Sequence, residues 1–233
     1  MGLREFLRRL FDFLAPRLCC ICQTRLDAHE NSVCEDCLRN LPYTMYHTKA
    51  LDNPLARLFW KRINIERATA LFFYYPRSEA ANIIYDMKYH GGRDIGYDMG
   101  RYSALWLEKH HFFEGIDCII PVPLSRKRLR KRGYNQSEDI AEGLSSVTHL
   151  PILTDVVRRV TFHESQTHLS HFQRQENLKD AFQLRHPEKI ADKHILVVDD
   201  VITSGATVCA CASVMEKAGE VKISVFALGF TQD

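Results

Sequence analysis

The sequence predicts an α/β fold in which helices flank a mainly parallel β-sheet, preceded by a small cysteine-rich module. Three observations lead to this prediction. Between residue 68 and the C-terminus, short apolar runs alternate with helical segments, and unbroken apolar strands are typical of parallel sheets covered on both faces. Two CxxC pairs lie close together near the N-terminus. The chain has 233 residues, 45% of them hydrophobic, which suffices for one ordinary domain and a small module.

The first segment with helical spacing covers residues 3 to 14. Its leucine and phenylalanine residues lie along one stripe, and Arg8, Arg9 and Asp12 interrupt any continuous apolar run. We expect a surface helix packed on the body of the protein, with a membrane-surface or partner helix as the alternative. Because these charged residues interrupt the run and no small-residue cleavage site follows, neither a signal peptide nor a membrane span is expected. The expected location is the cytoplasm, where the eight cysteines remain thiols or metal ligands.

The cysteine-rich module is predicted to bind a structural zinc ion through Cys19, Cys22, Cys34 and Cys37. Each CxxC pair places two thiolates on one tight turn, and two such turns complete the tetrahedral shell that zinc prefers. This closed site leaves no open position for chemistry, but metal binding can fold a module too small to have its own core. The alternative is a set of free buried thiols. Cys20 is poorly spaced for a ligand, because a single residue separates it from Cys22.

The next elements follow from apolar runs, caps and glycines. Residues 42 to 64 contain two prolines and show no clear period, so a connector is expected there. An apolar strand is expected at 68–75. Ser78 can cap a following helix that runs to residue 89 and that Gly91 and Gly92 would end. A second helix is expected at 93–110.

The second half of the chain repeats this alternation. Strands are expected where apolar residues run unbroken and helices where the segments between them are longer. The expected strands are 117–122, 152–157, 195–200 and 222–230, and the expected helices are 135–146 and 205–218. We expect two units, an N-terminal helix and zinc module at 1–45 and an α/β domain at 65–233.

The sharpest motif is ILVVDDVITSGAT at residues 195–207. A buried strand ends in two acids, and five small residues then turn into a helix. Small residues let backbone amides approach an anion closely, and the helix start adds a partial positive charge. No lysine follows the glycine, so this is not the nucleoside-triphosphate loop, and a phosphate monoester suits it better. The predicted phosphate ligands are Thr203, Ser204, Gly205, Ala206 and Thr207.

The acids of this motif, Asp199 and Asp200, are the predicted catalytic residues. Their carboxylates can accept hydrogen bonds from the two ribose hydroxyls, either directly or with a bound magnesium ion. The alternative is that the acids simply cap the next helix. The whole arrangement closely resembles the loop that binds phosphoribosyl pyrophosphate (PRPP) in type I phosphoribosyltransferases.

A second candidate loop follows the strand at 117–122. By resemblance to type I phosphoribosyltransferases, Pro123, Leu124, Ser125 and Arg126 occupy the place of the pyrophosphate loop. Residues 126–132 read RKRLRKR, although the formal net charge of the chain is only +2. These cations suit a pyrophosphate leaving group or a nucleic-acid backbone, and a solvated basic helix face is the alternative. Arg126, Arg128 and Arg132 are favoured as anion ligands, because arginine can bind phosphate bidentately.

The segment from 158 to 182 is long, polar and poorly periodic, which is typical of lids and of flexible surface loops. In phosphoribosyltransferases a mobile loop at this place closes over the reaction centre and excludes water. The candidate contacts of such a lid are Gln166, Ser170, Arg174 and Asn177.

The sequence as a whole resembles the ComF/GntX family of competence-associated, phosphoribosyltransferase-like proteins. The resemblance rests on the CxxC pairs, KYHGGR at 88–93, PVPL with RGYNQS before residue 138, the 161–182 segment and VVDDVITSGAT. It implies an N-terminal zinc module joined to a type I phosphoribosyltransferase domain, with magnesium accompanying PRPP. It also implies a role in DNA uptake and in the use of external DNA.

Three functions are compatible with this sequence. The first is an enzyme, a pentosyl-transferring glycosyltransferase that moves phosphoribosyl from PRPP to an acceptor. The second is a non-enzymatic competence accessory protein in which the basic run and the zinc module bind single-stranded DNA. The third is a PRPP sensor that regulates a partner. Competence or helicase proteins are the protein partners that such roles imply.

Overall fold

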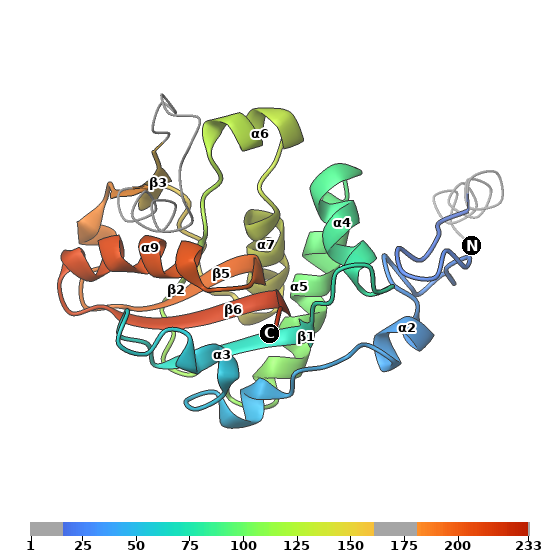
Figure 1. The fold of residues 1–233 in the computed structure, drawn as a ribbon, viewed down its shortest axis with the longest axis horizontal. Helices are drawn as coiled ribbons and strands as arrows, with labels where there is room; N and C mark the ends of the chain where they lie inside the picture. The colour runs from blue at the N-terminus through green and yellow to red at the C-terminus, as the bar shows by residue number, and fades with distance from the viewer. Residues whose placement is uncertain (1–15, 161–180, 233) are drawn as a thin grey trace.

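The computed structural model describes residues 16–160 and 181–232 and confirms the predicted fold class (Figure 1). A four-stranded sheet has the order β1-β6-β5-β2, and every pair in it is parallel. Two shorter strands, β3 and β4, form an antiparallel pair beside it. The strands are β1 (Arg67–Phe73), β2 (Cys118–Pro121), β3 (Val157–Arg159), β4 (Phe182–Leu184), β5 (His194–Ile202) and β6 (Lys222–Phe230).

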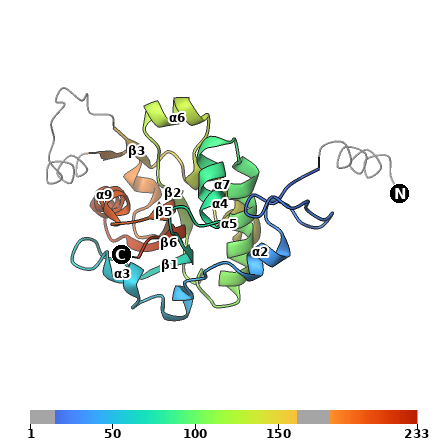
Figure 2. The ribbon, with the colours of Figure 1, turned by 45° about the vertical axis from the view of Figure 1, so that its right-hand side comes forward.

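Helices occupy both sides of the sheet (Figure 2). Those described are α2 (Glu35–Arg39), α3 (Pro54–Arg57), α4 (Ala81–Tyr89), α5 (Arg93–Glu108), α6 (Arg126–Arg132), α7 (Gln136–Thr148) and α9 (Ala206–Met215), with 3-10 turns at Tyr46–Lys49, Pro187–Lys189 and Glu216–Ala218. Helix α9 lies on one face of the sheet, and α4, α5 and α7 lie on the other.

The apolar strands are unbroken because both of their faces are buried. Along β5, Ile195 and Val197 belong to the apolar cluster under α9, whereas Leu196 and Val198 belong to the cluster under α5 and α7. Successive side chains of a strand point to opposite faces, so a strand covered on both sides needs apolar residues at every position. This confirms the prediction of a buried strand at 195–200, and the strand order places it inside the sheet, between β6 and β2.

Helices α5 and α7 approach each other closely. A Cβ atom on Gly143 would lie 2.1 Å from the Tyr97 carbonyl oxygen, and one on Gly100 would lie 2.3 Å from that of Ile140. Only glycine allows the two backbones to touch in this way. The contact fixes α7, whose first turn faces the carboxyl ends of β2 and β5.

Three expectations about the elements were wrong. Ser78 does not cap α4, which begins at Ala81 with Ala80 at its N-cap and without a side-chain cap hydrogen bond. Residues 152–157 do not form a strand of the main sheet: Ile152 makes a single parallel bridge to Ile119, and the chain bends at 154–156 before β3 begins. The connector at 42–64 contains a 3-10 turn and helix α3. The Asn53 side chain accepts a hydrogen bond of 2.9 Å from the Ala56 amide, and Pro54 occupies the first helical position, so a short helix starts there.

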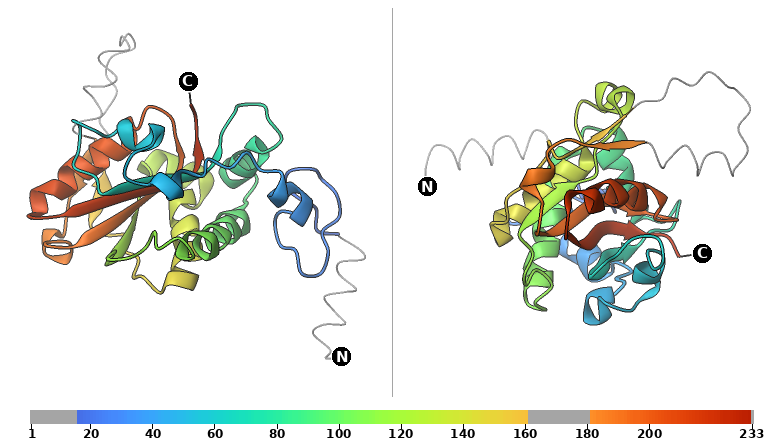
Figure 3. Two further views of the ribbon diagram at one scale, coloured as in Figure 1. Left: turned by 90° about the horizontal axis from the view of Figure 1, so that it is seen from below. Right: turned by 90° about the vertical axis from the view of Figure 1, so that its left-hand side faces the viewer.

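The cysteine module packs against the body at the end of the molecule where α4 and α5 lie (Figure 3). Its Cys19, Ile21 and Val33 share one apolar cluster with residues of α4 and α5. The Ser32 hydroxyl donates to the Asp98 carboxylate of α5, and the Tyr43 hydroxyl lies 2.8 Å from that of Tyr102. The expected helix at 3–14 and the expected lid contacts Gln166, Ser170, Arg174 and Asn177 lie outside the described residues.

Within 16–160 and 181–232, none of the helices combines the length and the apolar character that crossing a membrane requires.

Candidate functional site

The predicted phosphate and pyrophosphate loops lie at the same edge of the sheet. Strands β2 and β5 are parallel neighbours, with Pro121 paired to Val198. The loop at 122–125 therefore begins next to Asp199, although the two are far apart in the sequence. Crevices outside the carboxyl ends of parallel strands are where α/β proteins bind ligands.

The two predicted catalytic acids lie inside β5 rather than after it, since the strand continues to Ile202 in register with β6. Asp199 accepts a hydrogen bond of 3.2 Å from the Ser137 hydroxyl and one of 2.9 Å from the Asp200 amide. Burial, followed by the neighbouring charge of Asp200, raises the pKa of Asp199 to about 7. The site thus holds a carboxyl group that changes its charge near neutral pH.

Asp200 is held by a residue from a distant helix. The Lys88 ammonium of α4 lies 3.0 Å from the Asp200 carboxylate, and both side chains are largely buried. The Val201 amide donates a further hydrogen bond of 2.6 Å to Asp200. Lys88 offsets the repulsion between two adjacent carboxylates, which would otherwise oppose their burial.

The loop between β5 and α9 has the geometry expected of an anion-binding turn. Thr203 and Ser204 are exposed, and Gly205 adopts a left-handed conformation with φ of 67°. A Cβ atom on Gly205 would lie 2.9 Å from the Phe59 ring, so glycine is required there by both backbone and packing. Helix α9 then starts at Ala206 without a side-chain cap, which leaves its first amides available to an anion. Arg62 donates a hydrogen bond of 2.8 Å to the Ser204 carbonyl.

The predicted pyrophosphate loop leads into the basic run, which forms helix α6. Pro123, Leu124 and Ser125 are partly buried, and the Ser125 hydroxyl caps α6 by accepting a hydrogen bond from the Arg128 amide at 3.3 Å. Arg126 and Arg128 are exposed. Gly133 ends the helix in a left-handed conformation with φ of 82°.

The residues after α6 connect the two loops, a role that sequence reasoning missed. The Asn135 side chain donates to the Val122 carbonyl at 3.1 Å and accepts from the Ser137 amide at 3.3 Å, so it ties the start of α7 to the end of β2. The Tyr134 hydroxyl donates to the Met87 carbonyl of α4 at 2.7 Å. The asparagine was readable as a helix cap, but its partner on β2 was not.

Arg159 is a further basic residue that the sequence did not single out. It lies at the end of β3, half-buried, with its guanidinium carbon 5.2 Å from the centre of the Phe182 ring. Burial, and then the positive charge of Arg128, lower the pKa of Arg159, while Asp199 acts in the opposite direction. Arg159 therefore adds positive charge beside Asp199 and α6.

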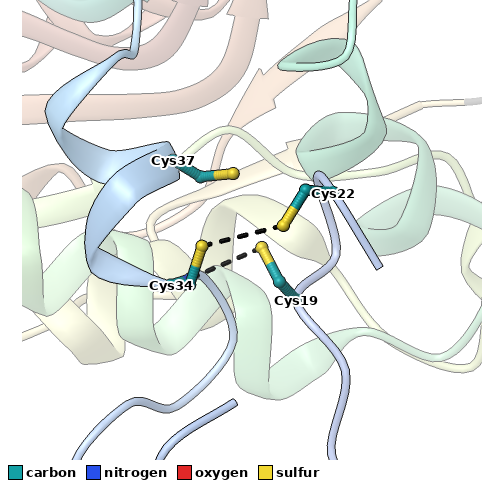
Figure 4. Close-up of side chains that lie close together, drawn as sticks. All are labelled: Cys19, Cys22, Cys34 and Cys37. Carbon is teal, nitrogen blue, oxygen red and sulfur yellow. Dashed lines mark hydrogen bonds between the residues drawn. The ribbon is translucent and has the colours of Figure 1, made fainter. Parts of the chain in front are cut away.

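The four predicted zinc ligands come together (Figure 4). The sulfur atoms of Cys19, Cys22, Cys34 and Cys37 all lie within 4.8 Å of one another, and those of Cys22 and Cys34 are 3.7 Å apart. Four sulfurs bound to zinc at ~2.3 Å in a tetrahedron would be about 3.8 Å apart, so the cluster fits this ion closely. Cys20 is not part of the cluster and is buried in the adjacent apolar core.

Comparison with known proteins agrees with this arrangement. Residues 129–229 match the family model described as a phosphoribosyl transferase domain. The DNA utilization protein YhgH of Shigella flexneri is 29% identical over 214 residues, which cover 91% of this chain and 89% of that protein. Competence protein F of Haemophilus influenzae is 37% identical over 122 residues, covering 52% of this chain and 53% of that protein.

Among solved structures, glutamine PRPP amidotransferase from B. subtilis, complexed with ADP and GMP, aligns with 56% of this chain at a TM-score of 0.37 and 18% identity. The present chain covers 25% of that chain. A TM-score this low supports no conclusion about function.

The parallel sheet, the acidic strand end and the small-residue turn define a phosphoribosyltransferase-like protein. Its N-terminal cysteine module and its relatives narrow this class of protein further. The chain is similar over most of its length to a DNA utilization protein and over half of its length to a competence protein, and this supports its resemblance to the ComF family.

We expect the purified protein to contain one zinc ion per chain, measured by elemental analysis. Replacing Cys37 by alanine removes one of four ligands and should release most of the metal. The matched control is Cys20→Ala, which changes a neighbouring cysteine outside the cluster and should retain the ion. Equal zinc loss from both variants, or no zinc in the wild type, would contradict the four-cysteine assignment.

Asp199→Asn should stabilise the fold in a pH-dependent way. Because folding raises the pKa of Asp199 from 3.8 to about 7, its contribution to stability falls as pH rises through that window and then stays constant. The free energy of unfolding of the variant should therefore exceed that of the wild type by about 1–3 kcal/mol at pH 8 and by much less at pH 4, as measured by urea unfolding.

Asp155→Asn is the control. The hydrogen bond from Lys189 lowers the pKa of the exposed Asp155 carboxyl, so this substitution should change the free energy of unfolding only slightly and in the opposite direction. A difference between Asp199→Asn and wild type that stays the same from pH 4 to pH 8 would count against a raised pKa.

Proposed function

We propose that this protein binds PRPP with magnesium and transfers its phosphoribosyl group to a nucleophilic acceptor. The observation that carries the proposal is the pair Asp199–Asp200 followed by an uncapped helix start in one continuous turn. Carboxylates suit a ribose diol, and free amides at a helix start suit the 5-phosphate. The two carboxylates and the amides of the helix start belong to one continuous stretch of backbone. They can therefore bind the ribose hydroxyls and the 5-phosphate of one sugar phosphate at the same time.

Each part of the site has a defined task in this reaction. The amides of 203–207, with the Thr203, Ser204 and Thr207 hydroxyls, hold the 5-phosphate. Asp199 and Asp200 orient the ribose, and the carboxylates are suitable ligands for a magnesium ion, which would neutralise charge on the pyrophosphate. The loop at 123–126 and the positive charge of Arg128 and Arg159 face the side where the leaving group is expected.

The transfer itself requires little covalent participation from the protein. The bond between C1 of the ribose and the pyrophosphate oxygen breaks, and pyrophosphate leaves with the electron pair. A lone pair of the acceptor, such as a base nitrogen, forms the new bond to C1, and the acceptor loses its proton to solvent. Positive charge develops on the ribose ring, so the nearby carboxylates stabilise the transition state.

A second candidate function is the binding of single-stranded nucleic acid, which α6 and α4 favour. Five of the six cations of α6 are exposed. On α4, Tyr85 and Tyr89 are each more than half exposed, and the Arg132 guanidinium lies 5.7 Å from the centre of the Tyr89 ring. Basic grooves interleaved with exposed aromatic rings are typical of proteins that bind single strands through phosphates and stacked bases.

Titration calorimetry with PRPP and magnesium tests the first proposal. Asp200→Asn should weaken binding by about 10–100-fold, because a charge-assisted hydrogen bond to ribose is lost. Affinity of the wild type should increase as pH rises through about 7, since Asp199 must lose its proton to act as an acceptor. Asp155→Asn is the control for replacing an acid by an amide away from the site. Wild-type protein that releases no heat with PRPP would refute the proposal. Binding of PRPP without release of its pyrophosphate in the presence of any acceptor would favour the sensor role.

Filter binding of a labelled oligonucleotide tests the second candidate. Affinity should fall steeply with salt if several phosphates are contacted. Tyr89→Ala should weaken binding of single strands by about 1–3 kcal/mol, whereas Trp60→Ala, another exposed aromatic beside an arginine, should have no effect. An oligonucleotide affinity that does not change with salt, or an equal loss of affinity in Tyr89→Ala and Trp60→Ala, would contradict this function.

A further inference from the structure

Helix α4 lies between the cysteine module and the carboxyl ends of the strands (Figures 1 and 3). It has nine residues, and its N-cap position, Ala80, provides no side-chain hydrogen bond. A helix this short has little stability of its own, so its position depends on what it packs against. The contacts on its two sides therefore decide where its side chains lie.

On one side, α4 rests on the module. Its buried residues Ile83, Ile84 and Met87 belong to the apolar cluster that contains Cys19, Cys20 and Ile21 from the first CxxC turn. The Asn82 side chain donates a hydrogen bond of 3.4 Å to the Ile21 carbonyl, between the metal ligands of that turn. Figure 4 shows α4 directly behind Cys22. The segment that holds the metal and the segment that supports α4 are the same.

On the other side, α4 reaches the phosphoribosyl site. Lys88, in its last turn, makes the ion pair of 3.0 Å with Asp200. The Tyr134 hydroxyl, next to the start of α7, donates to the Met87 carbonyl at 2.7 Å. Asn82, which bonds to the module, therefore lies less than two helical turns before Lys88, which contacts the acid.

We propose that Lys88 is a positioning residue of the phosphoribosyl site and that the cysteine module, folded by its metal ion, keeps Lys88 in place through α4. The inference rests on the function proposed above. A cation held beside Asp200 keeps its carboxylate oriented toward the ribose diol and adds positive charge where an anionic ligand arrives. Metal occupancy and PRPP affinity are therefore coupled, and each ligand strengthens the binding of the other by the same factor.

The coupling follows from the size of the module. Residues 16–41 contain no strand and one helix of five residues, α2, in the part of the chain that the structure describes. Four thiolates around one ion are what fixes the turn at 19–22. Without the ion, the Ile21 carbonyl and the apolar residues beside it lose their defined positions, and α4 loses its support on that side.

The test measures PRPP affinity by calorimetry and amide hydrogen exchange of α4, in protein with zinc and after chelation. Metal removal should weaken PRPP binding of the wild type about tenfold and accelerate exchange at residues 83–89 by a similar factor. Lys88→Met should bind PRPP about tenfold more weakly than wild type and lose nothing further on chelation, because the residue that transmits the effect is gone. Lys189→Met is the control, since Lys189 pairs with the exposed Asp155 instead.

Asn82→Ala keeps the metal and removes one bond between the module and α4, so it avoids general unfolding. It should accelerate α4 exchange and weaken PRPP binding in the same direction as chelation. Unchanged PRPP affinity after chelation, or an equal loss in wild type and Lys88→Met, would overturn the proposal.

If the zinc-loaded wild type does not bind PRPP at all, the proposed function fails, and the positioning role fails with it. The exchange of α4 then reports separately on the module contact: unchanged exchange after chelation refutes that contact as well.

Discussion

The structure depends on holding two adjacent carboxylates, Asp199 and Asp200, within the buried strand β5. Adjacent like charges in a partly buried place repel each other, and burial penalises both of them. The fold offsets this cost with three partners: the Ser137 hydroxyl on Asp199, the Lys88 ammonium on Asp200, and backbone amides of the strand itself. Burial and the neighbouring charge of Asp200 still raise the pKa of Asp199 to about 7. An arrangement that costs stability is more typical of a binding site than of a structural cap.

Residues 133–137 connect the two acids of β5 to the neighbouring elements. Gly133 ends the basic helix, Tyr134 reaches α4, Asn135 caps α7 and joins it to β2, and Ser137 reaches Asp199. Five consecutive residues thus connect α6, α4, β2 and β5. This stretch belongs with the site because it joins these elements, although Ser137 is the one of its residues that contacts Asp199.

The cysteine module is part of the same structure rather than an appendage. Its apolar residues share a core with α4 and α5, and its carbonyl at Ile21 receives a hydrogen bond from α4. This contact gives the four-cysteine cluster a physical connection to Asp200 through α4 and Lys88, in a chain whose relatives are named for competence and DNA utilization. The basic and aromatic surface of α6 and α4 borders the same edge, so a polyanion and a sugar phosphate would be bound by neighbouring elements.

The sequence by itself determined the features that depend on short stretches of chain. Alternating apolar runs identified the parallel sheet, and the CxxC spacing identified the four clustered cysteines. The order of acids, small residues and helix start identified the turn between β5 and α9, for which anion binding stays a prediction. Each of these needs only neighbouring residues. The strand expected at 152–157 failed because pairing is decided by the adjacent strand, and Ile152 alone meets Ile119. Lys88, Ser137 and Arg159 were not foreseen for the same reason: their spacing from Asp199 along the chain carries no signal, and only the tertiary fold, by packing α4, α7 and β3 around β5, brings their charges and hydroxyls to the acids.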